Sequence, residues 1–252
     1  MSNYIYYPDL NNIDFYKKIF VKKEFKKNNT KNIEVNDFSL LPQQSFLKNY
    51  ININTPYNSI LIYHGTGVGK TCSAITIAEG FKKALKNKKI IVLLSRNIKD
   101  NFMKELYNTD KPDNKQCVGT EYKYKDDFKY EKKEKKVLQI KKNIRKYYKF
   151  YGYTQFANKV MKLTKWDGTP QKITNETKST IKRNYSNSVF IIDEVHHIKT
   201  LSDSDSEIKK IPPILEAILE HSENIKLVMM SATPMYDTPR EIVFLLNLML
   251  LN

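Results

Sequence analysis

A glycine-rich turn between two apolar segments limits what this chain can fold into more than any other feature. Residues 64–71 read His-Gly-Thr-Gly-Val-Gly-Lys-Thr, directly after the apolar run 59–63 and before an apolar-periodic stretch. A strand, a glycine-rich turn and a helix in this order wrap backbone N–H groups around a polyphosphate, and the helix N-terminus adds partial positive charge. The pattern therefore predicts a binding site for a nucleoside triphosphate.

The strict form of this pattern has a glycine six residues before the lysine, where this chain has His64. In such loops the lysine reaches the β- and γ-phosphates and the hydroxyl that follows it ligates Mg²⁺, which assigns these roles to Lys70 and Thr71. A glycine-rich loop without a ligand is the alternative, and the Lys-Thr pair argues against it. The residues predicted to bind the nucleotide from this turn are Gly65, Thr66, Gly67, Val68, Gly69, Lys70 and Thr71.

An acidic pair follows a second apolar run, Ser188–Ile192. A run of this length suits a strand buried on both faces, whose carboxyl end borders the ligand crevice of an open parallel sheet. There Asp193 would hold Mg²⁺ through water and Glu194 would polarise the attacking water. Two acids after a strand can also be a solvated turn, but the lysine-bearing loop upstream favours a site. Asp193, Glu194 and Lys70 are the predicted catalytic residues.

A third apolar run, 225–230, leads into Ser-Ala-Thr. The phosphate loop, Asp-Glu-x-His and Ser-Ala-Thr, in this order and each after a strand, resemble motifs I, II and III of superfamily 2 helicases. The resemblance implies that Ser231 and Thr233 couple the nucleotide site to the nucleic-acid path. It also places His196 between the γ-phosphate and motif III. ATP and Mg²⁺ are the cofactors that the resemblance implies.

The same resemblance suggests residues that contact nucleic acid or the base. Arg96 follows the apolar run 89–94 where the family has motif Ia, and an ordinary solvated arginine is the alternative. Thr154 and Gln155 lie in a segment similar to motif Ib. Gln44 precedes motif I where the family places a residue near the adenine, although a solvated glutamine fits the sequence equally well.

A narrower resemblance is to the poxvirus-type branch of nucleocytoplasmic large DNA viruses, which includes nucleoside triphosphate phosphohydrolase I and the early transcription factor small subunit. Residues 15–25, 41–44 and 230–235 carry it. It implies a role in viral transcription, a location in the virion and the host cytoplasm, and viral RNA polymerase or transcription factor subunits as partners. The lysine-rich middle of the chain stays unmatched.

The net charge of +16 is unevenly distributed, since +12 of it lies between residues 121 and 185. Such a patch raises affinity for phosphate backbones through counterion release, and nucleic acid, DNA rather than RNA, is the predicted partner. A solvated lysine-rich helix is the alternative. Its apolar positions Val137, Ile140, Ile144, Tyr147 and Tyr151 step by three or four, which is typical of a core-facing stripe whose tyrosines pack rather than stack on bases.

The two cysteines, Cys72 and Cys117, suggest neither a disulfide framework nor a metal site, which suits a reducing compartment. Cys72 is expected to be a packing residue. The N-terminus lacks the apolar core of a signal peptide, and no apolar run approaches the roughly 18 residues that a membrane span needs. The chain is therefore predicted to be intracellular, monomeric and without a membrane partner.

Alternating strands and helices predict an α/β fold, a doubly wound and mainly parallel sheet of the RecA-like type. Residues 1–38 are predicted to be a lead-in and residues 39–252 the ATP-binding domain, with a lysine-rich helical insertion at about 108–150. Helices are expected at 14–26, 42–50, 70–86 and 98–107, and strands at 60–63 and 89–94.

The predicted function is that of the ATP-binding motor domain of a nucleic-acid-dependent ATPase, a helicase or translocase. Motors of this family use a second RecA-like domain, whose arginines stabilise the transition state. Nothing after Thr233 resembles its motifs, so that domain is expected to be absent and the fragment to hydrolyse ATP weakly. The alternative function is an ATP-gated interaction module of a viral transcription complex, without strand separation.

Overall fold

The computed structural model describes residues 7–26, 40–65, 67, 69–85, 88–112, 115–119, 121–123, 133–200, 210–235 and 240–252, with Arg96, Lys199, Thr200 and Arg240 described by their backbone alone. The chain forms two compact units, each built from several segments. The first unit comprises Met1–Tyr57, Thr71–Ala84 and Phe102–Ile144, and the second comprises Asn58–Lys70, Leu85–Asn101 and Arg145–Asn252.

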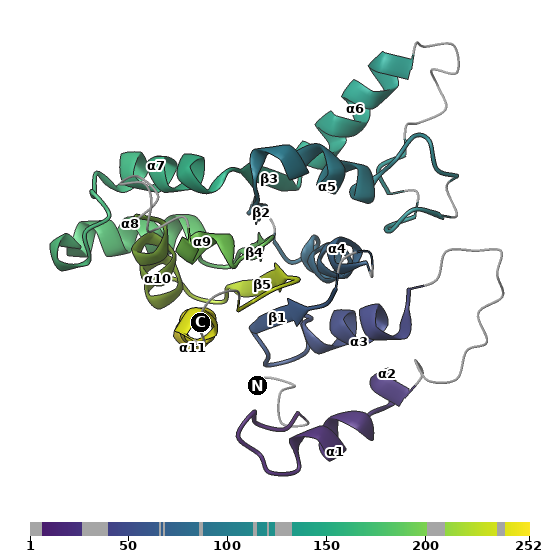
Figure 1. Ribbon diagram of the computed structural model, residues 1–252, viewed down its shortest axis with the longest axis horizontal. Coiled ribbons are helices and arrows are strands. Elements are labelled where there is room, and N and C mark those ends of the chain that lie inside the picture. The colour runs from purple at the N-terminus through teal and green to yellow at the C-terminus, as the bar shows by residue number, and fades with distance from the viewer. Residues whose placement is uncertain are drawn as a thin grey trace. The chain divides into compact units, whose positions relative to one another are not determined.

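The second unit contains a five-stranded sheet in which every pair of neighbouring strands is parallel. The strand order is β1-β5-β4-β2-β3 (Figure 1). This confirms the predicted doubly wound α/β fold of the RecA-like type. The strands are β1 (Ser59–Tyr63), β2 (Ile90–Leu93), β3 (Tyr148–Tyr151), β4 (Val189–Ile192) and β5 (Lys226–Ser231).

The register of the sheet brings the ends of the motif-bearing strands to one edge. Tyr63 at the end of β1 lies opposite Ser231 at the end of β5, and Leu93 at the end of β2 lies opposite Ile192 at the end of β4. Because all strands are parallel, the segments after β1, β4 and β5 leave the sheet at the same edge.

One face of the sheet packs on α7, α8, α10 and α11. Alternate residues of β2, β4 and β5 share a buried core with these helices, as the period of two along a strand requires. The regular helices of this unit are α7 (Tyr153–Thr164), α8 (Asn175–Tyr185), α9 (His197–Thr200), α10 (Ile211–His221) and α11 (Arg240–Leu251), with 3₁₀ turns η3 (Arg96–Ile98) and η6 (Pro170–Lys172).

The first unit is helical wherever the structure describes regular secondary structure in it. It contains α1 (Phe15–Phe20), α2 (Lys23–Lys26), α3 (Pro42–Tyr50) and nearly all of α4 (Lys70–Phe81) and α6 (Lys133–Arg145), together with most of α5 (Lys99–Leu106). No helix in the ranges that the structure describes is both long and apolar enough to cross a membrane.

The single helix predicted over residues 14–26 was wrong, because the chain turns between α1 and α2. Ile19 and Phe25 are both buried. Six residues along one continuous helix would point them in directions about 120° apart. The turn at Val21 and Lys22 allows both side chains to pack inward. The helix predicted over 70–86 also ends early, at Phe81.

The stripe predicted over residues 137–151 was correct only in part. Ile140 and Ile144 on α6 are buried, but α6 ends at Arg145 and Tyr147 is 39% exposed. The helical spacing therefore stops short of Tyr147, and Tyr151 belongs to β3 instead. Packing of Tyr147 in a core was a wrong prediction.

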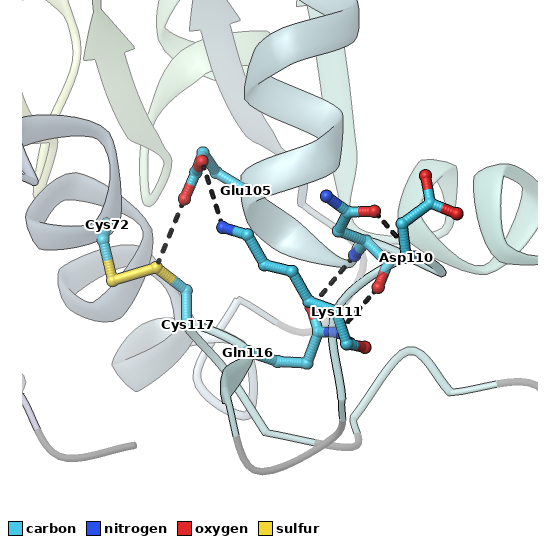
Figure 2. A network of polar contacts seen from close by, with 7 residues as sticks. Cys72, Glu105, Asp110, Lys111, Gln116 and Cys117 are labelled. Carbon is cyan, nitrogen blue, oxygen red and sulfur yellow. Dashed lines mark hydrogen bonds and ion pairs between the residues drawn. A yellow bond between two sulfur atoms is a disulfide. The ribbon is translucent and has the colours of Figure 1, made fainter. Parts of the chain in front are cut away.

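The two cysteines form a disulfide, which corrects the prediction that they would not. Cys72 on α4 is bonded to Cys117, with a Cα–Cα distance of 5.7 Å (Figure 2). The segment that carries Cys117 is held by Gln116, whose amide donates to the carbonyls of Asn108 at 2.7 Å and Lys111 at 2.9 Å. A sequence separation of 45 residues gives no indication of such a pair, because only the fold brings the two segments together.

The half-buried Lys226 at the start of β5 yields a prediction about stability. Its Nζ donates to Asn58 Oδ1 at 2.8 Å, and burial lowers the pKa of this amine to about 8. Since the unfolded chain keeps the ordinary lysine pKa of about 10.4, it binds more protons than the folded chain between these values, and stability rises with pH across that window. Below it, the buried charge reduces stability.

We therefore expect Lys226→Met to raise the free energy of unfolding at pH 7 by about 1–2 kcal/mol, a value discounted for partial exposure. The gain should disappear near pH 10.5. Urea denaturation at both pH values measures this, with the exposed Lys149→Met as the control. An equal gain at both pH values would show that methionine acts through packing alone.

Candidate nucleotide-binding site

The glycine-rich turn lies between the end of β1 and the start of α4, as predicted. Gly67 has φ +80° and Gly69 has φ +78°, a conformation that glycine adopts without a steric cost. No heavy atom lies within 4 Å of where a Cβ of Gly65 or Gly67 would be, so the turn is open above its backbone. Thr66 and Val68 lie outside the described residues, and Thr71 is the second residue of α4.

Lys70 is half-buried and folds back over this turn. Its Nζ donates a hydrogen bond to the carbonyl oxygen of His64 at 3.0 Å. Residue 64 therefore contributes its backbone to the loop, which any amino acid can do, and this explains how histidine replaces the usual glycine. Among the described residues, the His64 Nδ1 is buried without a hydrogen-bond partner.

The acidic pair follows β4 directly and is largely shielded from water. Asp193 is 6% exposed, and its Oδ1 accepts the Glu194 N–H at 3.1 Å. Burial, together with the negative charge of Glu194, raises the pKa of Asp193 to about 6, against the opposing effect of Lys70. Glu194 has φ +50°, an uncommon backbone conformation for a residue with a side chain.

A hydrogen-bonded group connects this pair to the end of β5. His196 Nδ1 lies 2.8 Å from Ser231 Oγ, and Ser231 Oγ accepts the Thr233 N–H at 3.0 Å. His196 Nδ1 is also 3.4 Å from Glu194 Oε2. Burial, followed by the neighbouring His197, lowers the pKa of His196, which disfavours the charged imidazole. The structure thus brings together three predicted residues from two strand ends.

The acidic pair suits a divalent cation that is shared with phosphates. Among the described residues, Glu194 Oε2 is buried and makes no hydrogen bond, and Asp193 is buried beside it. No group of three or more His, Cys, Asp or Glu side chains that could hold a metal occurs in the described part of the chain. Mg²⁺ characteristically needs only one or two carboxylates when phosphates supply further ligands.

The nucleic-acid candidates lie after β2 and β3 in the second unit. Arg96 begins the 3₁₀ turn η3, and its side chain is outside the description. Thr154 and Gln155 lie in the first turn of α7, with Gln155 exposed and Thr154 half-buried. Gln155 Oε1 accepts the Gly152 N–H at 3.4 Å. These three positions therefore follow strand ends at the edge that also carries the acidic pair.

Gln44 lies in the first unit, on α3. It is 4% exposed, and its Oε1 accepts the N–H of Leu41 at 2.9 Å. This bond caps the N-terminus of α3. The Gln44 side chain therefore stabilises the start of α3. Its contact with adenine stays a prediction.

Tyr153 is a site residue that sequence reasoning missed. It is the first residue of α7, and its hydroxyl donates to the carbonyl oxygen of Asp193. The same hydroxyl lies 3.4 Å from the carbonyl oxygen of Glu194. An aromatic residue after a strand predicts only packing, and no local signal indicates a bond across 40 residues.

The fold and these strand ends define the class of the protein as a RecA-like α/β domain with a glycine-rich turn after its first strand. The sequence profile of the family described as "Type III restriction enzyme, res subunit" matches residues 39–236. The chain belongs to this family.

Viral proteins named as helicases are among its relatives. "Putative ATP-dependent RNA helicase R563" of Acanthamoeba polyphaga mimivirus is 33% identical over 213 residues, which cover 84% of this chain and 32% of that protein. "Putative ATP-dependent RNA helicase L377" of the same virus is 34% identical over 279 residues, covering 96% and 23%. "Putative helicase 087L" of Invertebrate iridescent virus 3 is 31% identical over 226 residues, covering 85% and 20%.

The chain thus spans between a fifth and a third of the length of these relatives. They come from a mimivirus and an iridescent virus, so the narrower likeness to the poxvirus-type branch stays a prediction.

Proposed function

We propose that this protein binds ATP with Mg²⁺ and hydrolyses it in response to nucleic acid, as the motor of a viral helicase or translocase used in transcription. The observation that carries the proposal is the convergence of strand ends at one edge of the sheet. There the turn with Lys70, the pair Asp193–Glu194 and the group His196–Ser231 follow β1, β4 and β5.

The predicted site residues each have a chemical task in this proposal. The Lys70 ammonium binds phosphate oxygens in place of the His64 carbonyl, and the Glu194 carboxylate accepts the proton of the attacking water. Asp193 would hold Mg²⁺, with Thr71 as the further ligand predicted from the sequence, and the ion would supply positive charge to the phosphates. Through the hydrogen bonds among His196, Ser231 and Thr233, a change at the nucleotide would alter the position of the segment after β5.

The cellular role that we propose goes beyond what the names of the relatives state. The relatives come from a mimivirus and an iridescent virus, and two of the three are named ATP-dependent RNA helicases. We infer a role in viral transcription in the virion and host cytoplasm, with DNA as the more favoured track and polymerase or transcription factor subunits as partners. The basic stretch between residues 121 and 185 supports a phosphate-backbone partner.

The test is ATP hydrolysis by the full-length protein without nucleic acid, with single-stranded or duplex DNA, and with RNA. We expect stimulation by at least one of these polymers. Hydrolysis that no polymer changes would favour the interaction module over the motor. The same titrations, read for the strongest stimulation, decide between DNA and RNA.

The lysines on and directly after α6 give a separate prediction about the nucleic acid that the protein binds. Lys135 and Lys142 on α6 and Lys146 directly after it are exposed. If they bind phosphates, replacing all three with glutamine should weaken nucleic-acid binding. The slope of log K against log salt should then fall by about 0.9 for each duplex phosphate that is no longer neutralised. ATP affinity should not change. Binding titrations at four or more salt concentrations measure the slope.

A charge-matched control comes from the N-terminal part of the chain. Lys18, Lys23 and Lys48 are exposed on α1, α2 and α3. Replacing these three with glutamine removes the same charge, and we expect a smaller effect on the slope. Equal slopes for both triple variants would show that α6 is a solvated face and that only general charge matters.

A further inference from the structure

A tyrosine hydroxyl at the start of α7, directly after β3, holds the backbone of the acidic pair Asp193–Glu194. β3 and β4 both flank β2, where Leu93 lies opposite Tyr151 on one side and Ile192 on the other. Two residues after Tyr151, Tyr153 begins α7, and its hydroxyl reaches the carbonyls of Asp193 and Glu194. The side chain is 6% exposed, so this contact lies within the core rather than at the surface.

The backbone that receives this hydroxyl is in an unfavourable conformation. Glu194 has φ +50°, a conformation in which the Cβ of an L-residue crowds its own backbone. Such a residue persists only where the surroundings fix it. On either side, the Asp193 N–H donates to the Leu93 carbonyl at 2.9 Å and the Val195 N–H donates to the Met230 carbonyl at 3.0 Å. Tyr153 holds the carbonyls between these two bonds.

A hydroxyl is required for this task. Backbone carbonyls only accept hydrogen bonds, so their partner must be a donor. A tyrosine hydroxyl carries its proton at neutral pH and can donate it. Phenylalanine would fill the same space and leave both carbonyls without this donor.

We propose that Tyr153 is a positioning residue for hydrolysis, which fixes the Asp193–Glu194 turn and makes the orientation of Glu194 depend on the position of the first turn of α7. The inference rests on the proposed function and deepens it. Thr154 and Gln155 follow Tyr153 in that first turn, and Gln155 is exposed. A nucleic acid that contacts this turn therefore displaces or fixes the same backbone that carries the hydroxyl.

The experiment compares Tyr153→Phe with Tyr185→Phe in the full-length protein. Tyr185 is a matched control, because it belongs to the same buried core and is 4% exposed. Within the described part of the chain, its hydroxyl has no hydrogen-bond partner. Removing that hydroxyl changes packing as little as removing the one on Tyr153, but breaks no contact with the acidic pair.

For Tyr153→Phe, we expect kcat of ATP hydrolysis with saturating nucleic acid to fall about tenfold, the factor that corresponds to one buried hydrogen bond. KM for ATP should stay within about twofold, and the ratio of stimulated to basal rate should fall. Tyr185→Phe should match the wild-type protein in all three quantities. Equal kcat and equal stimulation for the two variants would overturn the inference.

Hydrogen–deuterium exchange provides a readout that needs no activity. A peptide covering residues 190–197 should exchange faster in Tyr153→Phe than in either Tyr185→Phe or the wild-type protein, while α8 and α10 exchange alike in all three. Unchanged exchange in this peptide would also overturn the inference. A wild-type protein that hydrolyses no ATP would contradict the proposed function instead, and the exchange data would still decide whether Tyr153 fixes the turn.

Discussion

Replacing Glu194 with glutamine is expected to leave ATP bound and to lower the rate of hydrolysis at least about 100-fold. The amide keeps the size of the side chain and removes the group that accepts a proton from water. Glu194 Oε2 is buried and makes no hydrogen bond within the described residues, so no existing hydrogen bond has to break before it accepts one. The loss should therefore appear in kcat, with little change in the affinity for ATP.

Single-turnover hydrolysis and equilibrium binding of ATP, both with the full-length protein and nucleic acid, measure the two quantities. Glu216→Gln is the control, because Glu216 is another half-buried glutamate of the same unit, on α10. It should hydrolyse ATP at the wild-type rate. A similar rate for Glu194→Gln and the wild-type protein would remove Glu194 from the chemistry.

Replacing Lys70 with alanine is expected to weaken the binding of ATP or ADP by about 10- to 100-fold, as the loss of a charged hydrogen-bond donor implies. The Lys70 ammonium already lies over the turn, 3.0 Å from the His64 carbonyl. Phosphate oxygens need only replace this carbonyl, so the side chain is positioned in advance. No other lysine lies in the glycine-rich turn.

Calorimetry on the chain itself, with Mg²⁺ and either nucleotide, measures this affinity. Lys149→Ala is the matched control, since Lys149 is exposed on β3 of the same unit. We expect the control to bind as the wild-type protein does. If Lys70→Ala did the same, the assignment of the glycine-rich turn as a phosphate loop would be wrong.

The parts of the site that the sequence predicts are those that local physics determines. Apolar runs of four to six residues become the strands of the sheet, and the polar segments that follow them must then lie at strand ends. This is why the positions of Lys70, Asp193, Glu194 and Ser231 could be predicted. Parallel pairing, expected from alternating strands and helices, then brings these ends to one edge.

The features that escaped prediction all depend on contacts between distant segments. The hydroxyl of Tyr153 bonds to a carbonyl 40 residues away, and Cys72 pairs with Cys117 across 45 residues. The break between α1 and α2 serves the burial of Ile19 and Phe25 in one unit. Neither residue type nor spacing along the chain indicates any of these, because each is settled only when the core forms.

The Cys72–Cys117 bond gives the protein two covalent forms that differ by two hydrogen atoms. In the oxidised form the bond closes a ring of chain that contains all of β2 and α5. A ring of this size restricts the denatured chain by about 4 kcal/mol in the chain-entropy description. A thiol reductant in a purification buffer therefore selects which form is studied. Nucleotide affinities and unfolding energies from different laboratories are comparable only when the redox state of this pair is stated.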